Sequence, residues 1–217
     1  NSYTGLTTVS AGTLIANNNA ALGTTLGGTS VAGGATLEIT NGTTIGPEAL
    51  NISGAGVGSN GALVVTAGSA SIGGAVTLDA SASIGGNGSL TLGGTVEDTV
   101  PGTSTLTQVG SGTLTFSGTV GATNALAGMT TSVGQTTVIN GGSVTTSGDQ
   151  SYAGSLATGG ATALTATAGA ITATGIVTAT AGTLTLAAAS TGDISFNNAG
   201  NNFGTVAITS GKDVILR

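Results

Sequence analysis

Residues 88–118 read GSLTLGGTVEDTVPGTSTLTQVGSGTLTFSG, and this stretch decides the fold. Its two clearest runs, GSLTLG at 88–93 and GTLTFSG at 112–118, alternate apolar and hydroxyl side chains and are bounded by glycine. Such alternation over four to seven residues is typical of a short β-strand with one buried face. We therefore expect Leu90 and Leu92, and likewise Leu114 and Phe116, to point into a core.

The same pattern recurs along the whole chain. It appears in ATLEIT (35–40), GALVVT (61–66), AVTLDA (75–80), GTLTLA (182–187), GDISFN (192–197), GTVAIT (204–209) and KDVILR (212–217). Gly, Asn or Ser separates these runs, as expected for tight turns. No segment carries apolar residues at helical spacing over ten or more residues. The sequence therefore predicts an all-β protein with essentially no helix.

Composition narrows the architecture further. The chain of 217 residues contains 41 glycines, no tryptophan and only 2% aromatic residues. A sandwich or barrel ordinarily fills a core about 10 Å thick with larger side chains on longer strands. The narrow interior of a parallel β-helix suits small aliphatic side chains, and its corners suit glycine and asparagine. We predict a parallel β-helix (solenoid) of roughly ten short coils, each of about 20 residues.

Three of the five aromatic residues share a local context. Tyr3, Tyr152 and Phe203 each follow a polar residue and precede glycine by one or two positions. We expect these rings to be corner residues that cap the interior where a turn opens it.

The charge balance excludes several partners. Lys212 and Arg217 are the only basic residues, so residues 1–211 contain no cation that could neutralise phosphate. Nucleic acid and anionic membrane surfaces are therefore poor partners. No apolar run approaches the roughly 20 residues that cross a bilayer as a helix. The absence of cysteine excludes disulfides, thiolate nucleophiles and sulfur ligands for a metal.

The inventory of catalytic groups is small. Histidine, the usual general base, is absent, and the acidic residues are scattered along the chain. They are Glu38, Glu48, Asp79, Glu97, Asp98, Asp149, Asp193 and Asp213. Only Glu97 and Asp98 are adjacent, and neighbours on a strand face different directions more often than they form an acid/base pair. We therefore predict no catalytic, cofactor-binding or metal-binding residues and no enzyme activity.

Three weaker motifs favour structural interpretations. GGNGSLTLG at 85–93 begins like a calcium-binding β-roll repeat, but Leu90 occupies the position of the carboxylate ligand. Four Thr-x-Thr pairs follow one another at intervals of five to seven residues, which is far shorter than one coil. They therefore cannot stack into one flat ice-binding face. The pairs are Thr165/Thr167, Thr172/Thr174, Thr178/Thr180 and Thr183/Thr185. Asn41, Asn51 and Asn87 each begin an N-glycosylation sequon, and their modification stays open.

The first half of the chain resembles a known repeat. NSYTGLTTVSAGTLIANNNAALG at 1–23 is similar to the autotransporter-associated β-strand repeat, in which Asn-Thr-Tyr-Thr-Gly-x-Thr precedes a Gly-Thr-Leu strand. The matching residues are Asn1, Tyr3, Thr4, Gly5, Thr7, Gly12, Thr13 and Leu14, and Ser2 departs from the pattern. LTQVGSGTLTFSG at 106–118 resembles the phrase that usually precedes the next such repeat, although no second copy follows.

The second half resembles another family. TTVINGGSVTTSGDQSYAGSL at 136–156 and GDISFNNAGNNFGTVAITSGKDVILR at 192–217 are similar to the repeats of filamentous-haemagglutinin-like secreted exoproteins. These resemblances divide the chain into residues 1–118 and 119–217, which we expect to form one continuous β-helix. They imply a right-handed β-helix outside a Gram-negative-type cell.

The expected function is that of a non-catalytic structural stalk or passenger segment of a large cell-surface or secreted bacterial adhesin. The alternatives are a self-associating subunit of an extracellular filament or sheath and, less favoured, a polysaccharide-active β-helix enzyme. Expected partners are further coils of the same parent chain, identical chains stacked end to end, and cell-surface glycans or proteins.

The two ends of the chain carry the last expectation. Terminal coils of a solenoid expose unpaired backbone groups and apolar interior unless they are capped. In KDVILR we expect Val214 and Leu216 to face inward and Ile215 outward. Residues 1–15 and 205–217 are therefore predicted contact surfaces for further coils.

Overall fold

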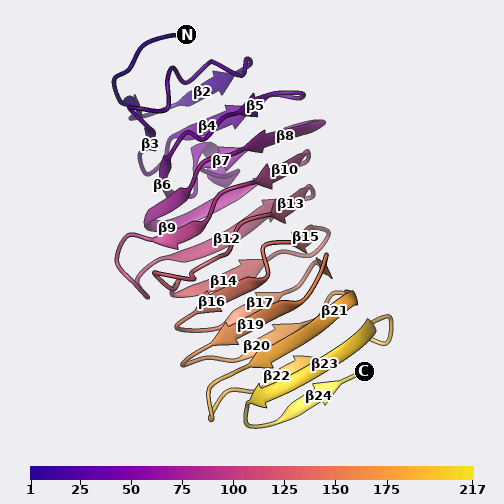
Figure 1. The fold of residues 1–217 in the computed structure, drawn as a ribbon. Helices are drawn as coiled ribbons and strands as arrows, with labels where there is room; N and C mark the ends of the chain where they lie inside the picture. Colours follow the sequence, from indigo (N-terminus) through magenta and orange to yellow (C-terminus); the bar gives the residue numbers. More distant parts are fainter.

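The computed structural model describes residues 1–217 and consists almost entirely of parallel strands stacked into a β-solenoid of about ten turns (Figure 1). A single 3₁₀ turn, Val57–Ser59, is its only helical element. The predicted fold class is thereby confirmed.

The strands are short, as the spacing of glycine in the sequence requires. In chain order they are β1 Thr7–Val9, β2 Thr13–Ala16, β3 Thr29–Val31, β4 Thr36–Ile39, β5 Thr44–Ile45, β6 Leu50–Gly54, β7 Leu63–Val64, β8 Ser69–Ile72, β9 Val76–Gly86, β10 Ser89–Leu92, β11 Val96–Asp98, β12 Thr105–Gly110, β13 Thr113–Phe116, β14 Gly128–Thr131, β15 Thr136–Ile139, β16 Ser143–Thr146, β17 Gln150–Tyr152, β18 Ser155–Thr158, β19 Thr162–Ala166, β20 Ile171–Ala173, β21 Val177–Ala187, β22 Ile194–Phe196, β23 Asn202–Ser210 and β24 Val214–Leu216.

Equivalent residues of successive coils form continuous columns along the solenoid. One column runs through Thr7, Thr29, Leu50, Val76, Val96, Val120, Val144, Leu164, Leu186 and Ile208. It crosses from residues 1–118 into 119–217 through the bridge between Val96 and Val120, without a break in pairing. The stack of coils in Figure 1 is accordingly uninterrupted.

A second column lies on another side of each coil. It contains Leu14, Leu37, Leu63, Ile84, Gln108, Thr131, Tyr152, Ala173, Phe196 and Leu216. A third side is formed by β5, β8, β10, β13, β15 and β18, where Ile45, Ile72, Leu92, Phe116 and Ile139 stack.

The apolar members of these columns form the core. Leu37, Leu78, Leu90, Leu114 and Leu184 are all buried, as the alternation predicted. Burying one such side chain contributes about 1.5–3 kcal/mol. Because each coil supplies only a few of them, stability depends on stacking one coil on the next.

Asparagine side chains and glycine shape the corners. Asn19 Oδ1 accepts a hydrogen bond from the Thr44 N–H, and Asn41 Oδ1 accepts one from the Ser69 N–H, both at 2.9 Å. Each therefore joins one coil to the next. Gly86, at the end of β9, has φ of 107°, and a Cβ there would clash with the Val65 carbonyl.

The expectation that Tyr152 lies at a corner is wrong. Its side chain is fully buried on β17, in the second column. Phe203 lies half-buried on β23 with its ring 6.3 Å from that of Phe196. Tyr3 precedes β1, is 41% exposed and shares a 2.6 Å hydrogen bond with the Thr7 hydroxyl.

The side chains of the last strand, β24, point in the predicted directions. Val214 pairs with the interior Ile194, Leu216 with the interior Phe196, and Ile215 with the outward Ser195. Val214 and Leu216 are nevertheless 43% and 39% exposed. The apolar interior is therefore uncovered at this end of the stack.

Candidate functional site

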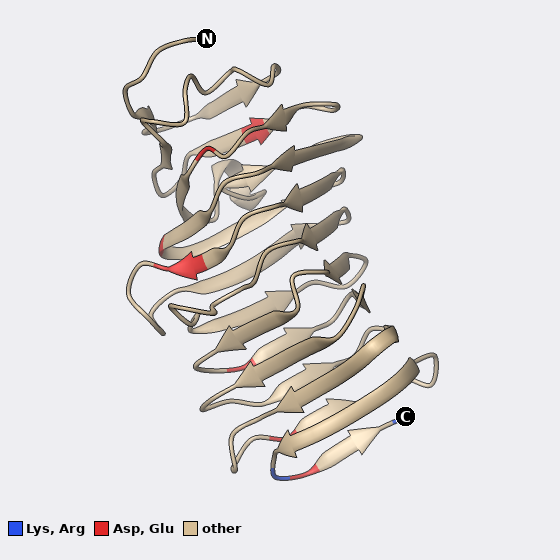
Figure 2. Ribbon diagram, in the orientation of Figure 1, with Lys and Arg blue, Asp and Glu red and all other residues tan.

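The acidic residues do not gather into a catalytic group. Figure 2 shows them dispersed from coil to coil. No three His, Cys, Asp or Glu side chains lie together in a way that could hold a metal ion. The closest pair in the sequence, Glu97 and Asp98, lies on β11 and is split by the alternation of that strand.

Glu97 points outward and accepts hydrogen bonds from backbone N–H groups of the next coil. The Thr123 N–H lies 3.2 Å and the Asn124 N–H 2.7 Å from Glu97 Oε2. The carboxylate therefore anchors the 121–125 turn and is not paired with Asp98 as an acid/base couple.

Asp98 is fully buried and organises the 99–104 turn. Its Oδ2 accepts hydrogen bonds from the N–H groups of Thr103 and Ser104, at 2.8 and 2.7 Å. Burial raises the pKa of this carboxyl, but the hydrogen bonds from Ser104, Thr103 and Val100 outweigh that effect, so its pKa lies below the usual 3.8. A carboxylate held this way stabilises a turn and stays ionised.

Two further acids form polar ties between coils. Asn51 Nδ2 donates to both oxygens of Asp79, at 3.0 and 3.1 Å, and the Thr99 hydroxyl donates to Asp79 Oδ1 at 2.6 Å. The buried Glu48 accepts a 2.9 Å hydrogen bond from the buried Thr29 hydroxyl. Both carboxylates therefore act as hydrogen-bond acceptors that join successive coils.

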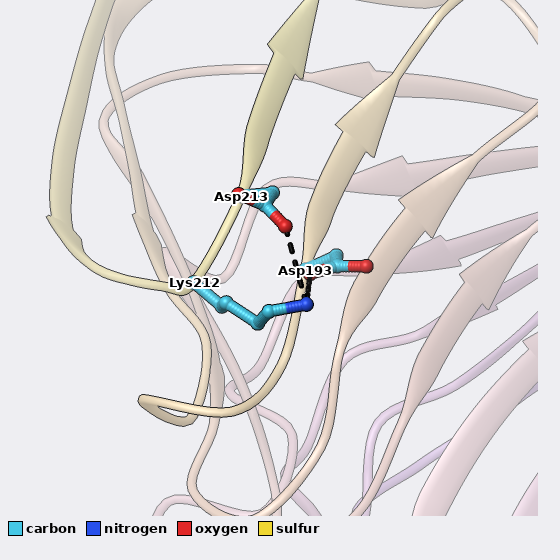
Figure 3. A network of polar contacts seen from close by, with 3 residues as sticks. All are labelled: Asp193, Lys212 and Asp213. Carbon is cyan, nitrogen blue, oxygen red and sulfur yellow. Dashed lines mark ion pairs between the residues drawn. The ribbon is translucent and has the colours of Figure 1, made fainter.

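The one cluster of opposite charges lies at the last turn. The Lys212 ammonium is 3.2 Å from Asp213 Oδ2 and 3.9 Å from Asp193 Oδ1 (Figure 3). A hydrogen bond to Asp213 and the charges of both carboxylates raise the pKa of Lys212. All three side chains are more than half exposed, so this cluster contributes little to stability.

The weak motifs fall on ordinary structural positions. The GGNGSLTLG segment forms the corner between β9 and β10, and Leu90 is buried in the core. Thr165 stacks beside Thr145, whereas Thr172 stacks between Ser151 and Ser195 on a different sheet. The threonine pairs therefore do not form one rank.

The sequon residues already take part in hydrogen bonds. Asn51 binds Asp79, Asn41 accepts from the Ser69 N–H, and Asn87 Oδ1 accepts a 2.9 Å bond from the Ser111 hydroxyl. Each of them joins two successive coils.

The alternation of short strands does not predict one feature of the fold, an excursion at residues 55–62 between β6 and β7. The GAGVGSNG segment at 54–61, with four glycines in eight residues, is the signal that marks it. Leu37 pairs with Leu63, 26 residues later, whereas Ala70 pairs with Leu90, only 20 residues later. The additional residues leave the wall of the solenoid and border a hollow of about 280 Å³.

Comparison with known proteins supplies no identification, because no family model, curated protein or solved structure matches the chain. Among the elements of the fold, no helix has the length and apolarity needed to span a membrane.

Proposed function

We propose that this chain is a non-catalytic structural segment of a larger bacterial cell-surface or secreted adhesin. Its role is to extend or space the elements that make contact with other cells. One observation carries the proposal: in-register columns run unbroken through the whole stack, so the coils act as a single rod.

The chemistry of the surface supports this role. The carboxylates that a hydrolase would need in one cleft are separated and engaged in ties between coils, as with Asp79 and Glu97. The outer faces carry mainly serine and threonine, for example in the stack of Ser69, Ser89, Thr113 and Thr136. Such a surface is hydrated and suits exposure outside the cell.

The filament subunit remains the second candidate, and the uncovered apolar side chains of the last coil favour it. Val206, Ile208, Val214 and Leu216 continue the interior columns, and each is partly or largely exposed in this coil. An identical chain stacked end to end would cover these side chains.

Electron microscopy of the purified parent protein and immunogold labelling of intact producing cells test the proposal. A stalk predicts separate rods and label on the cell surface. A regular end-to-end lattice would favour the filament, and label confined to the cell interior would contradict both. Turnover of a polysaccharide by the purified chain would overturn the non-catalytic assignment.

A further inference from the structure

The excursion at 55–62 is held rigidly against the solenoid. The buried Thr36 hydroxyl accepts a 2.8 Å hydrogen bond from the Val57 N–H and donates a 2.9 Å bond to the Gly61 carbonyl. The Gly61 N–H also donates to the Ala55 carbonyl at 2.8 Å, which closes the loop at its base. The segment is therefore a preformed structure.

The same loop contains the one strained residue of the chain. Ser59 has φ of 60° and is the only non-glycine residue with a positive φ. A left-handed conformation is unfavourable for such a residue, and it persists only where the surroundings enforce it. Strain of this kind concentrates at binding sites, which makes the neighbouring hollow a site of interest.

The hollow lies between the excursion and the corners of three successive coils. Its lining includes the polar residues Ser59, Asn60, Thr66 and Asn87 and the apolar residues Val64 and Val109. On the outward face, Gly85 pairs with Val64 on one side and Val109 on the other. The Val109 side chain packs against Gly85, where an added Cβ would lie 2.5 Å from Val109 Cγ2.

The lining of the hollow is neutral and offers several free hydrogen-bonding groups. Asn60 makes no side-chain hydrogen bond within the protein, and Asn87 uses only its Oδ1, toward Ser111. The Thr66 hydroxyl donates to Glu38 Oε1 at 2.6 Å, which engages the nearest carboxylate. With no cation among the lining residues, the hollow does not suit phosphate or sulfate.

We propose that this hollow binds one neutral pyranose ring, either a free sugar or the terminal unit of a glycan. A pyranose presents neighbouring hydroxyls that pair with amide and hydroxyl groups, together with apolar C–H faces that pack on the two valines. The volume of about 280 Å³ is near the lower end for small-ligand pockets, which fits one ring and not a longer oligosaccharide. This inference does not depend on the proposed stalk function.

Nuclear magnetic resonance titration of the ¹⁵N-labelled protein tests the inference. The probes are the methyl glycosides of glucose, galactose, mannose, N-acetylglucosamine and fucose. At least one should shift amide signals at Asn60, Gly86, Asn87 and Gly110. Tighter binding of an oligosaccharide that ends in the same unit identifies a glycan terminus as the source, and equal binding identifies the free sugar.

Three variants localise the interaction. Asn60→Ala and Asn87→Ala should each weaken binding about tenfold, since each removes hydrogen bonds to the ligand. Val109→Phe should abolish binding by filling part of the hollow with a larger side chain, with an unchanged circular dichroism spectrum. Asn197→Ala, at an exposed asparagine on another coil, is the control and should bind as the parent chain does. Absence of shifts with every probe, or binding that survives all three substitutions in the hollow, would overturn the inference.

Discussion

Tyr152 donates a 3.0 Å hydrogen bond from its hydroxyl to Oε1 of Gln150, and both side chains lie fully buried inside the solenoid. Gln150 Nε2 in turn donates to the carbonyls of Val144 and Thr165, at 3.2 and 2.9 Å. The pair therefore links the wall of one coil to that of the next. It is a polar tie in a core that is otherwise mainly aliphatic.

Substitution Tyr152→Phe removes this tie while keeping the ring. We expect it to lower the free energy of unfolding by about 1–3 kcal/mol, because Gln150 Oε1 is left buried without a donor. Urea unfolding followed by circular dichroism measures the loss. Tyr3→Phe, at an exposed ring, is the control and should change stability by less than about 0.5 kcal/mol. Equal effects of the two substitutions would contradict the buried network.

The same tyrosine predicts a loss of stability at alkaline pH. Burial raises the pKa of the Tyr152 hydroxyl far above the 10.0 of an exposed tyrosine. Above pH 10 the unfolded chain loses this proton and the folded chain keeps it, so the stabilisation present below pH 10 declines as pH rises. The urea midpoint should fall between pH 9 and 11 in the parent chain and fall less in Tyr152→Phe. An identical pH profile for both proteins would be incompatible with the buried hydroxyl.

Asp98 predicts the corresponding behaviour in acid. Its lowered pKa means that its contribution is complete above the unfolded pKa of 3.8 and is lost as pH falls through the folded value. Asp98→Asn should destabilise the protein at pH 7 by about 1–3 kcal/mol, because the Thr103 and Ser104 N–H groups lose a charged acceptor. It should also reduce the dependence of the urea midpoint on pH below 4. Asp213→Asn, which changes an exposed carboxylate, is the control and should have neither effect.

The interior columns predict opposite outcomes at adjacent residues. Leu90→Asp places an unpaired charge between Ala70 and Leu114 and should cost more than about 3 kcal/mol. Thr91→Asp, at the outward neighbour, should cost less than about 1 kcal/mol. Chemical denaturation of both variants provides the comparison. Full tolerance of Leu90→Asp would rule out the stacked core.

The alternation of side chains was sufficient to predict the solenoid. About four residues of local sequence are enough to predict that Leu90, Leu114 and Leu184 are buried, and glycine marks the turns on both sides of each strand. Because every coil repeats the same local rule, local pattern and overall fold agree. The outward position of Ile215 followed from the same rule.

What the sequence could not supply depends on contacts between coils. The local sequence around Tyr152 predicted a corner position. In the structure its hydroxyl donates a hydrogen bond to the buried Gln150, and the side chain lies in the interior. The hollow beside Asn60 requires Thr36 to anchor a loop that begins about 20 residues later. It also requires residues of successive coils, among them Val64, Asn87 and Val109, to line the same hollow. Register between coils is not encoded in any single segment.

Electron spin resonance distances along one outward column test the central claim, the in-register stacking of the coils, most directly. Thr44, Val138, Ala157 and Thr178 belong to one column, and the chain has no cysteine to interfere with labelling. With one spin label at Thr44→Cys, second labels at Val138→Cys, Ala157→Cys and Thr178→Cys lie four, five and six coils away. The solenoid predicts distances of about 19, 24 and 29 Å, an increase of about 4.8 Å per coil. Distances that do not increase steadily from one coil to the next would contradict the stacking.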